Sequence, residues 1–165
     1  MSAHSSVSQG GQQGGPAPAL PGGGLARTIA LVGLMGAGKS TVGRKLAESL
    51  NSPFVDSDEE IEKAAGLSVQ EIFDKLGEPE FRRGERRVIE RLLNGPPIVL
   101  ATGGGAFMDA ATRALMKDKA TTVWLRADLE ATRAPIYAEA DFVVDSGDGP
   151  ATDAVKAIRE ALGIQ

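Results

Sequence analysis

The chain has 165 residues, of which 42% are hydrophobic and 4% aromatic, and its formal net charge is −4. This length fits one domain with an aliphatic core, and the acidic balance argues against non-specific binding to nucleic acid. The absence of cysteine excludes disulfides and thiolate sites, and the lone histidine, His4, offers no basis for a histidine triad. No apolar run reaches the roughly 18 residues of a membrane span, so we expect a cytoplasmic monomer that binds neither membrane nor nucleic acid.

Residues 1–26 are rich in Gly, Gln, Ser, Ala and Pro and contain almost no large apolar side chain. Such a stretch buries too little surface to offset its ordering entropy. We therefore predict a disordered tail at 1–26 before a single domain at 27–165, with a partner-binding segment as the alternative for the tail.

Short apolar runs separated by amphipathic stretches follow the tail. Runs typical of buried strands lie at 28–32, 53–56, 97–101, 121–125 and 141–145. Periodicity and stop signals predict helices at 39–50, 59–65, 69–76, 80–93, 109–117 and 152–162. A capping box, Ser68 with Glu71, is expected to begin the third helix. This alternation indicates an α/β fold whose parallel sheet is covered on both faces and binds ligands at the carboxyl ends of its strands.

A phosphate-binding pattern lies between the first predicted strand and the first predicted helix. The sequence GLMGAGKS at 33–40 matches G-x-x-x-x-G-K-[ST], in which glycines let backbone N–H groups converge on phosphate oxygens. Lys39 adds a charge at the β and γ phosphates, and the Ser40 hydroxyl is placed to hold Mg²⁺. The motif predicts a nucleoside triphosphate as ligand, but GTPases, ATPases and small-molecule kinases share it.

Two carboxylates follow the second predicted strand. Asp56 and Asp58 are two residues apart, so on a strand they would share a face and point toward the phosphate loop. One could orient Mg²⁺ through water, and the other could accept the proton of an attacking hydroxyl. The alternative is an ordinary solvated helix N-terminus, where acidic residues are common.

Two further patterns concern the acceptor of the phosphoryl group. Arg82 and Glu85 are helical neighbours, so Glu85 could hold the guanidinium for a bidentate grip on a substrate carboxylate. The alternative is a surface ion pair. Three glycines at 103–105 follow a predicted core strand and permit close backbone approach to a ligand, with a plain turn as the alternative.

Four blocks, in this order and spacing, resemble the shikimate kinase family: GLMGAGKST at 33–41, FVDSDEEIE at 54–62, GEPEFRRGE at 77–85 and ATGGGA at 101–106. The resemblance runs from Arg27 to about Leu129 and resumes at PIYAEAD, 135–141. It implies a three-layer αβα P-loop kinase fold with a five-stranded parallel sheet of strand order 2-3-1-4-5. The implied activity is ATP-dependent phosphorylation of the shikimate 3-hydroxyl, in the route to aromatic amino acids.

The resemblance also assigns roles by position. Asp58 would bind the substrate and act as base, with Lys39 also catalytic, and Asp56 would hold Mg²⁺ through water. Arg82 and Arg133 would grip the substrate carboxylate, which Gly104 would meet with its backbone N–H. The residues that would hold the ATP phosphates are Gly36, Ala37, Gly38, Lys39, Ser40 and Thr41, with Ser40 also a Mg²⁺ ligand.

The resemblance fails between the fourth and fifth predicted strands, where the family carries a helix, an arginine-bearing lid and a second helix. That is about 30 residues or more at ordinary element lengths, whereas here 129–135 reads only LEATRAP. A parallel crossover needs roughly a dozen residues, so the sheet can still close across 127–140. Either the sequence omits residues of the natural protein, which we favour, or the lid is deleted. Arg133 precedes APIY as the family's second carboxylate-binding arginine does, but it also fits the lost first helix.

Two other functions compete with the leading one. Another small-molecule kinase, such as a gluconate kinase, would share the phosphate loop but has less use for Arg82, Glu85 and the triple glycine. A nucleotide-binding module with weak or no catalysis would fit the missing lid. The loop at 146–150, where adenine contacts are expected, lacks the basic residue that some family members carry.

Overall fold

A computed structural model describes residues 7–9, 19–20, 24–33, 38–126, 134–145 and 149–164. Five parallel strands form the body of the sheet: β4 (Thr28–Val32), β5 (Phe54–Asp56), β6 (Val99–Ala101), β7 (Ala120–Arg126) and β8 (Phe142–Asp145). They lie side by side as β8-β7-β4-β6-β5. Numbered along the chain, this order is 2-3-1-4-5 from the β5 edge, as the resemblance implied.

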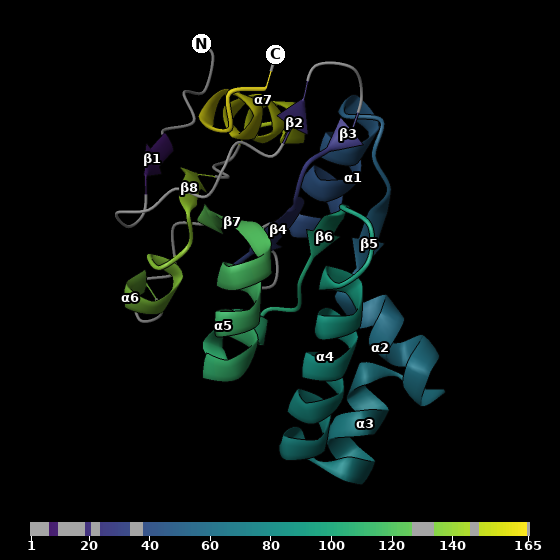
Figure 1. The fold of residues 1–165 in the computed structure, drawn as a ribbon. Helices are drawn as coiled ribbons and strands as arrows, with labels where there is room; N and C mark the ends of the chain where they lie inside the picture. Colours follow the sequence, from purple (N-terminus) through teal and green to yellow (C-terminus); the bar gives the residue numbers. More distant parts are fainter. Residues whose placement is uncertain are drawn as a thin grey trace.

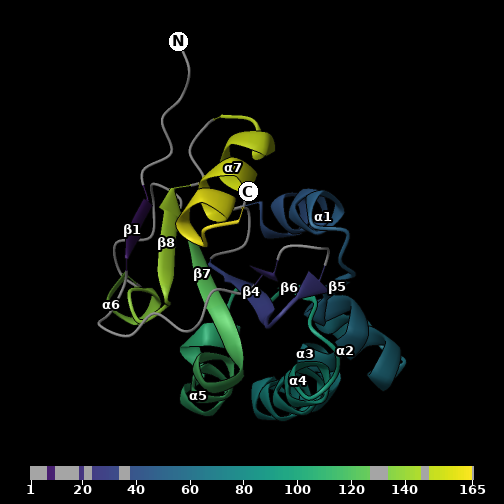
Figure 2. The same cartoon turned by 45° about the horizontal axis from the view of Figure 1, so that its top comes forward.

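Helices cover both faces of the sheet. They are α1 (Lys39–Ser49), α2 (Ser57–Ala65), α3 (Val69–Leu76), α4 (Glu78–Leu93), α5 (Ala110–Lys119), α6 (Ala134–Tyr137), α7 (Ala151–Ala161) and the short 3₁₀ turn η1 (Ala106–Met108). Figure 2 shows α1 and α7 on one side of the sheet and α2 to α5 on the other. The domain therefore has the three-layer αβα architecture that we predicted.

The central strand β4 contributes side chains to the hydrophobic core on both faces of the sheet. Ile29 and Leu31 pack toward α1 and α7, whereas Ala30 and Val32 pack toward α4 and α5. Because consecutive strand residues point to opposite faces, a strand buried on both sides has no polar alternation. This explains the continuous apolar run by which the strand was predicted.

Only parts of the segment before Arg27, for which a disordered tail was predicted, are among the described residues. The structure describes three short strands there: β1 (Val7–Gln9), β2 (Ala19–Leu20) and β3 (Gly24–Leu25). β1 pairs antiparallel with β8, and β2 pairs with β3 (Figure 1). An edge strand presents unpaired N–H and C=O groups, and β1 pairs with these groups of β8 through its backbone. The division of the chain at residue 26 into tail and domain stays a prediction.

Helix boundaries were predicted to within a few residues. The Ser68–Glu71 capping box is present, and Gly66 ends α2 in the left-handed conformation. Two helices begin two residues earlier than predicted: α2 at Ser57, because Asp56 caps it, and α4 at Glu78, where a proline lies in the first turn. Among the helices of the described ranges, none is long and apolar enough to cross a membrane.

Candidate active site

The predicted site residues gather at the carboxyl edge of three adjacent strands. Gly33 follows β4, Asp56 ends β5, and the glycines at 103–105 follow β6. Since β4, β6 and β5 are neighbours and parallel, these segments lie along one edge of the sheet.

The phosphate loop is described at its two ends, and the predicted phosphate-binding residues Gly36 and Ala37 lie outside the described residues. Gly38, at φ 85°, is the N-cap of α1 and requires the left-handed conformation that glycine tolerates. Lys39 begins the helix and is almost fully buried, with its Nζ donating to the Gly33 carbonyl oxygen at 2.5 Å. The amino end of α1 and a buried ammonium group therefore face the loop.

Glycine also sets how closely α1 approaches β5. A Cβ at Gly43 would lie 2.6 Å from a ring carbon of Phe54, so only glycine permits this contact. The close packing brings the first turn of α1 to the end of β5, where the Ser40 hydroxyl donates to Asp56 Oδ2 at 2.9 Å. Thr41, on the same turn, is exposed.

From their spacing we predicted that Asp56 and Asp58 share a strand face, but they do not. Asp56 ends β5, whereas Asp58 lies in the first turn of α2, and the Asp58 backbone N–H donates to Asp56 Oδ1 at 2.9 Å. The prediction was wrong because the chain turns into a helix directly at the Asp56 cap. The two carboxylates nonetheless remain close enough to interact electrostatically.

Asp58 is not a solvated helix-end carboxylate. Its Oδ1 atom is shielded from solvent and has no hydrogen-bond partner among the described residues. Burial raises the pKa of the Asp58 carboxyl and the charge of Asp56 raises it further, whereas Lys39 and Arg82 oppose the shift. A carboxyl with a raised pKa, facing a buried cation, has the properties of a proton acceptor.

The ion pair predicted from helical spacing is present and is largely buried. Arg82 Nη1 lies 2.9 Å from Glu85 Oε1, and the Glu85 side chain is 1% exposed, which excludes the surface ion pair that was the alternative. Burial raises the pKa of Glu85 even though Arg82 opposes the shift. Glu85 Oε2 has no hydrogen-bond partner within the described part of the chain.

The triple glycine brings the backbone into contact with these charged groups. A Cβ at Gly103 would lie 2.7 Å from Asp58 Oδ1 and 3.3 Å from Glu85 Oε2. A Cβ at Gly105 would collide with the Arg82 guanidinium. The loop is therefore no plain turn, because two carboxylates and a guanidinium converge on it.

Sequence reasoning gave no role to Tyr137. This buried residue of α6 donates its hydroxyl to the Gly104 carbonyl oxygen at 2.8 Å and stacks on Trp124 at 5.5 Å between ring centroids. Its hydrogen bond fixes the peptide plane between Gly104 and Gly105. The chain has a single tyrosine, and its place in PIYAEAD, where the family resemblance resumes, is the hint that the sequence offered.

Two further predictions concern residues that the structure does not describe. Arg133 falls outside the described residues, as does the 146–148 part of the loop where adenine contacts were expected. Within the described ranges there is no cluster of three or more His, Cys, Asp or Glu residues that could hold a metal ion. A cation at Ser40 and Asp56 would therefore depend on phosphate and water oxygens for its other ligands.

The parallel sheet, the loop that leads into α1 and the buried acceptor groups beside it define a P-loop kinase of the αβα class. A family model described as shikimate kinase matches residues 35–141. Two curated relatives, both named shikimate kinase, are from Caulobacter vibrioides and Paramagnetospirillum magneticum. The first is 52% identical over 83% of this chain and 82% of the relative, and the second 48% identical over 84% and 85%. The chain belongs to the shikimate kinase family.

Solved structures agree with this assignment. The shikimate kinase from Acinetobacter baumannii in complex with shikimate superposes with a TM-score of 0.78 at 36% identity, covering 83% of this chain and 93% of that chain. The shikimate kinase from Aquifex aeolicus gives 0.77 at 34% identity, with 82% and 96% covered.

The comparison with the Caulobacter relative also bears on the missing segment. The aligned stretch is 165 residues long, as long as this whole chain, yet it covers only 83% of the chain. The relative therefore contains residues inside the match that have no counterpart here. This agrees with the gap inferred between the fourth and fifth parallel strands.

Proposed function

We propose that this protein transfers the γ-phosphoryl group of ATP to the 3-hydroxyl of shikimate. The observation that carries the proposal is the convergence of Asp58, Arg82 and Glu85 on the glycines at 103–105, beside the amino end of α1. A small acid with hydroxyl groups needs one acceptor for a proton and a cation for its carboxylate, and this cluster of side chains offers both. The family, and a neighbour solved with shikimate, support the same substrate.

On the donor side, the phosphates would lie at the amino end of α1. We infer that Gly36 to Thr41 would supply backbone N–H groups to the phosphates, and the helix dipole favours negative charge. Lys39 is already held at the loop by the Gly33 carbonyl oxygen, so its ammonium group needs little rearrangement to meet the β and γ oxygens. Its charge would stabilise the transferring phosphoryl group.

Mg²⁺ fits the pair formed by Ser40 and Asp56. Hydroxyl and carboxylate oxygens are the ligands that this ion accepts, and the two atoms lie 2.9 Å apart at the edge of the phosphate loop. We infer that Ser40 would ligate the ion directly and that Asp56 would hold its waters. When bound, the ion would neutralise charge on the phosphate oxygens.

On the acceptor side, Asp58 would take the proton from the attacking hydroxyl as its oxygen bonds to the γ-phosphorus and the bond from that phosphorus to the β–γ bridging oxygen breaks, which leaves ADP. Its raised pKa, and an Oδ1 atom that has no hydrogen-bond partner among the residues that the structure describes, suit it to this step. Arg82, oriented by Glu85, would grip the carboxylate, and the Gly104 N–H would complete that contact. Arg133 would add a second guanidinium.

The missing lid argues for slow turnover. In this class an arginine that reaches the transferring phosphoryl group is worth about 10³-fold or more in rate, and a lid excludes water. The second candidate is thus a nucleotide-binding module with weak catalysis, and the third is a kinase for another acceptor, such as gluconate. We infer that any of the three would act in the cytoplasm as a monomer.

A coupled assay of ADP release separates these functions when it is run with shikimate, with gluconate and without acceptor. We expect shikimate alone to raise ADP release above the acceptor-free rate. If shikimate leaves ADP release unchanged, the proposed activity of this chain is wrong. The intact mass of the purified protein shows whether the natural protein contains the lid, since a mass several kilodaltons above 17.1 kDa would mean that the segment exists.

A further inference from the structure

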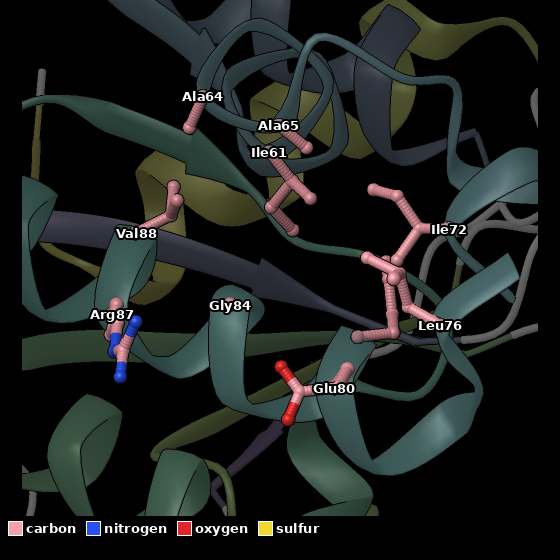
Figure 3. Close-up of a pocket in the computed structure, with 10 residues that line it drawn as sticks. Ile61, Ala64, Ala65, Ile72, Leu76, Glu80, Gly84, Arg87 and Val88 are labelled. Atoms are coloured by element: carbon pink, nitrogen blue, oxygen red, sulfur yellow. The ribbon is translucent and has the colours of Figure 1, made fainter.

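An apolar groove lies among α2, α3 and α4, away from the phosphate loop. Its volume is about 260 Å³, and Figure 3 shows the side chains that line it, which come from all three helices. The apolar walls are formed by Ile61, Ala65, Ile72, Leu76, Phe81 and Val88. None of the residues assigned to the proposed active site lines this groove.

Gly84 forms part of the groove wall in the middle of α4. A Cβ at this position would meet no atom within 4 Å, so packing does not require glycine there. Glycine in a helix interior is less favourable than alanine, so the fold alone gives no reason for it. What the missing side chain does is keep the groove open.

Arg87 lines the groove one turn beyond Gly84. It is exposed, and among the arginines in the described ranges it alone has neither a hydrogen bond nor an ion pair. The other charged residue of the lining, Glu80, is paired with Arg83. The groove therefore carries an uncompensated guanidinium, which suits a planar carboxylate.

Leu76 extends the apolar wall to the surface. At 53% exposure it is the large hydrophobic residue that stands out as exposed within the described part of the chain. An apolar wall that reaches solvent beside an unpaired cation is complementary to a ligand with both properties.

We propose that this groove binds a small carboxylate with an apolar, ring-sized body. The carboxylate would pair with Arg87, and the body would lie over Gly84 against the apolar walls. The volume is sufficient, since a cavity of about 150 Å³ accommodates benzene. This site is separate from the Arg82 site, because at about 100° per residue Gly84 and Arg87 lie on nearly the opposite face of α4 from Arg82 and Glu85.

The test titrates the full chain with phenylpropionate as the probe, in the presence of saturating shikimate. Binding is measured from the changes in backbone amide chemical shifts. Shift changes should cluster around the groove, at Ala64, Leu76 and Gly84. Phenylpropanamide, which has the same body without the charge, should bind about tenfold more weakly, since a hydrogen bond to a charged group is lost. Propionate, which has the carboxylate but no ring, should not bind in the concentration range in which phenylpropionate binds.

Variants locate the contact. Arg87→Gln should weaken phenylpropionate about tenfold, whereas Arg91→Gln, an exposed arginine one turn further along α4, should not. Gly84→Leu should abolish binding by filling the groove. Arg82→Gln should leave the probe affinity unchanged, which excludes binding at the proposed substrate site even if shikimate itself does not bind.

Three results would overturn the proposal: equal affinity for the acid and the amide, unchanged affinity in Arg87→Gln, or displacement of the probe by shikimate. If the groove instead binds only a protein partner and no small carboxylate at millimolar concentration, the proposed ligand class is wrong.

Discussion

The substitution Gly103→Ala tests whether the triple glycine places the acceptor groups. The new Cβ would lie 2.7 Å from Asp58 Oδ1, whereas ordinary contact begins at 3.4 Å, so the carboxyl group must move by about 0.7 Å. Glu85 Oε2, at 3.3 Å from the same point, limits the space into which the loop can shift. The carboxylate that we propose as base is therefore displaced from its position.

A misplacement of about 1 Å in a catalytic group lowers the rate by roughly 10²-fold, so we expect kcat to fall about 10- to 100-fold. The KM for ATP should not change, because the phosphate loop is not touched. The assay is ADP release with shikimate, with shikimate binding followed through the fluorescence of Trp124 if turnover is too slow.

The matched control is Gly84→Ala, which makes the same chemical change where a Cβ meets nothing within 4 Å. It should retain full activity. If Gly103→Ala also retains the wild-type kcat, the argument that Gly103 makes room for Asp58 is refuted. If both variants lose activity equally, the effect is not specific to the site.

Four further predictions follow from described contacts. Gly84→Ala should raise the free energy of unfolding by about 0.5–1 kcal/mol, measured by urea denaturation, because alanine is the better helix former. Tyr137→Phe removes the hydrogen bond to Gly104 and should raise the KM for shikimate about fivefold with the KM for ATP unchanged in initial-rate assays. Ser40→Ala should raise the Mg²⁺ concentration for half-maximal ATP binding about tenfold in a MgCl₂ titration. In the wild-type protein, EDTA should abolish the part of ATP binding that depends on Mg²⁺. Asp58→Asn should stop turnover yet raise thermal stability at pH 7 in the absence of ligand, with the advantage fading toward acid pH.

The sign of the Asp58 effect follows from its raised pKa. A carboxyl whose folded-state pKa lies above its unfolded value favours folding fully only below the unfolded value, and loses that contribution as pH rises through the folded pKa. At pH 7 the buried Asp58 carboxylate therefore lowers the free energy of unfolding, and the neutral asparagine removes this destabilisation. A wild-type protein more stable than the variant at pH 7 would contradict the described burial.

Local patterns in the sequence were sufficient for much of the fold. Each parallel strand was predicted from an apolar run, and the Ser68 capping box and the Arg82–Glu85 pair were predicted from fixed helical spacings. These features depend on residues three or four apart, so a single sequence carries the signal. The strand order came from the family resemblance and not from such spacings.

The features that sequence reasoning missed depend on distant contacts or on competing local structure. Tyr137 and Gly104 are 33 residues apart, and no local pattern indicates their hydrogen bond. The Asp56–Asp58 geometry was predicted wrongly because a strand face and a helix cap share the same short spacing, and the cap prevailed. The groove beside Gly84 requires three helices to be placed first, which periodicity alone does not do.

The position of Asp56 has a consequence for movement within the domain. One of its oxygens accepts a hydrogen bond from Ser40 on α1 and the other caps α2, so this side chain couples the two helices, together with the ion pair between Arg44 and Glu59. A change in the hydrogen bond between Asp56 and Ser40 would therefore reach Asp58, two residues further along the chain, and with it Arg82, whose charge acts on the Asp58 carboxyl.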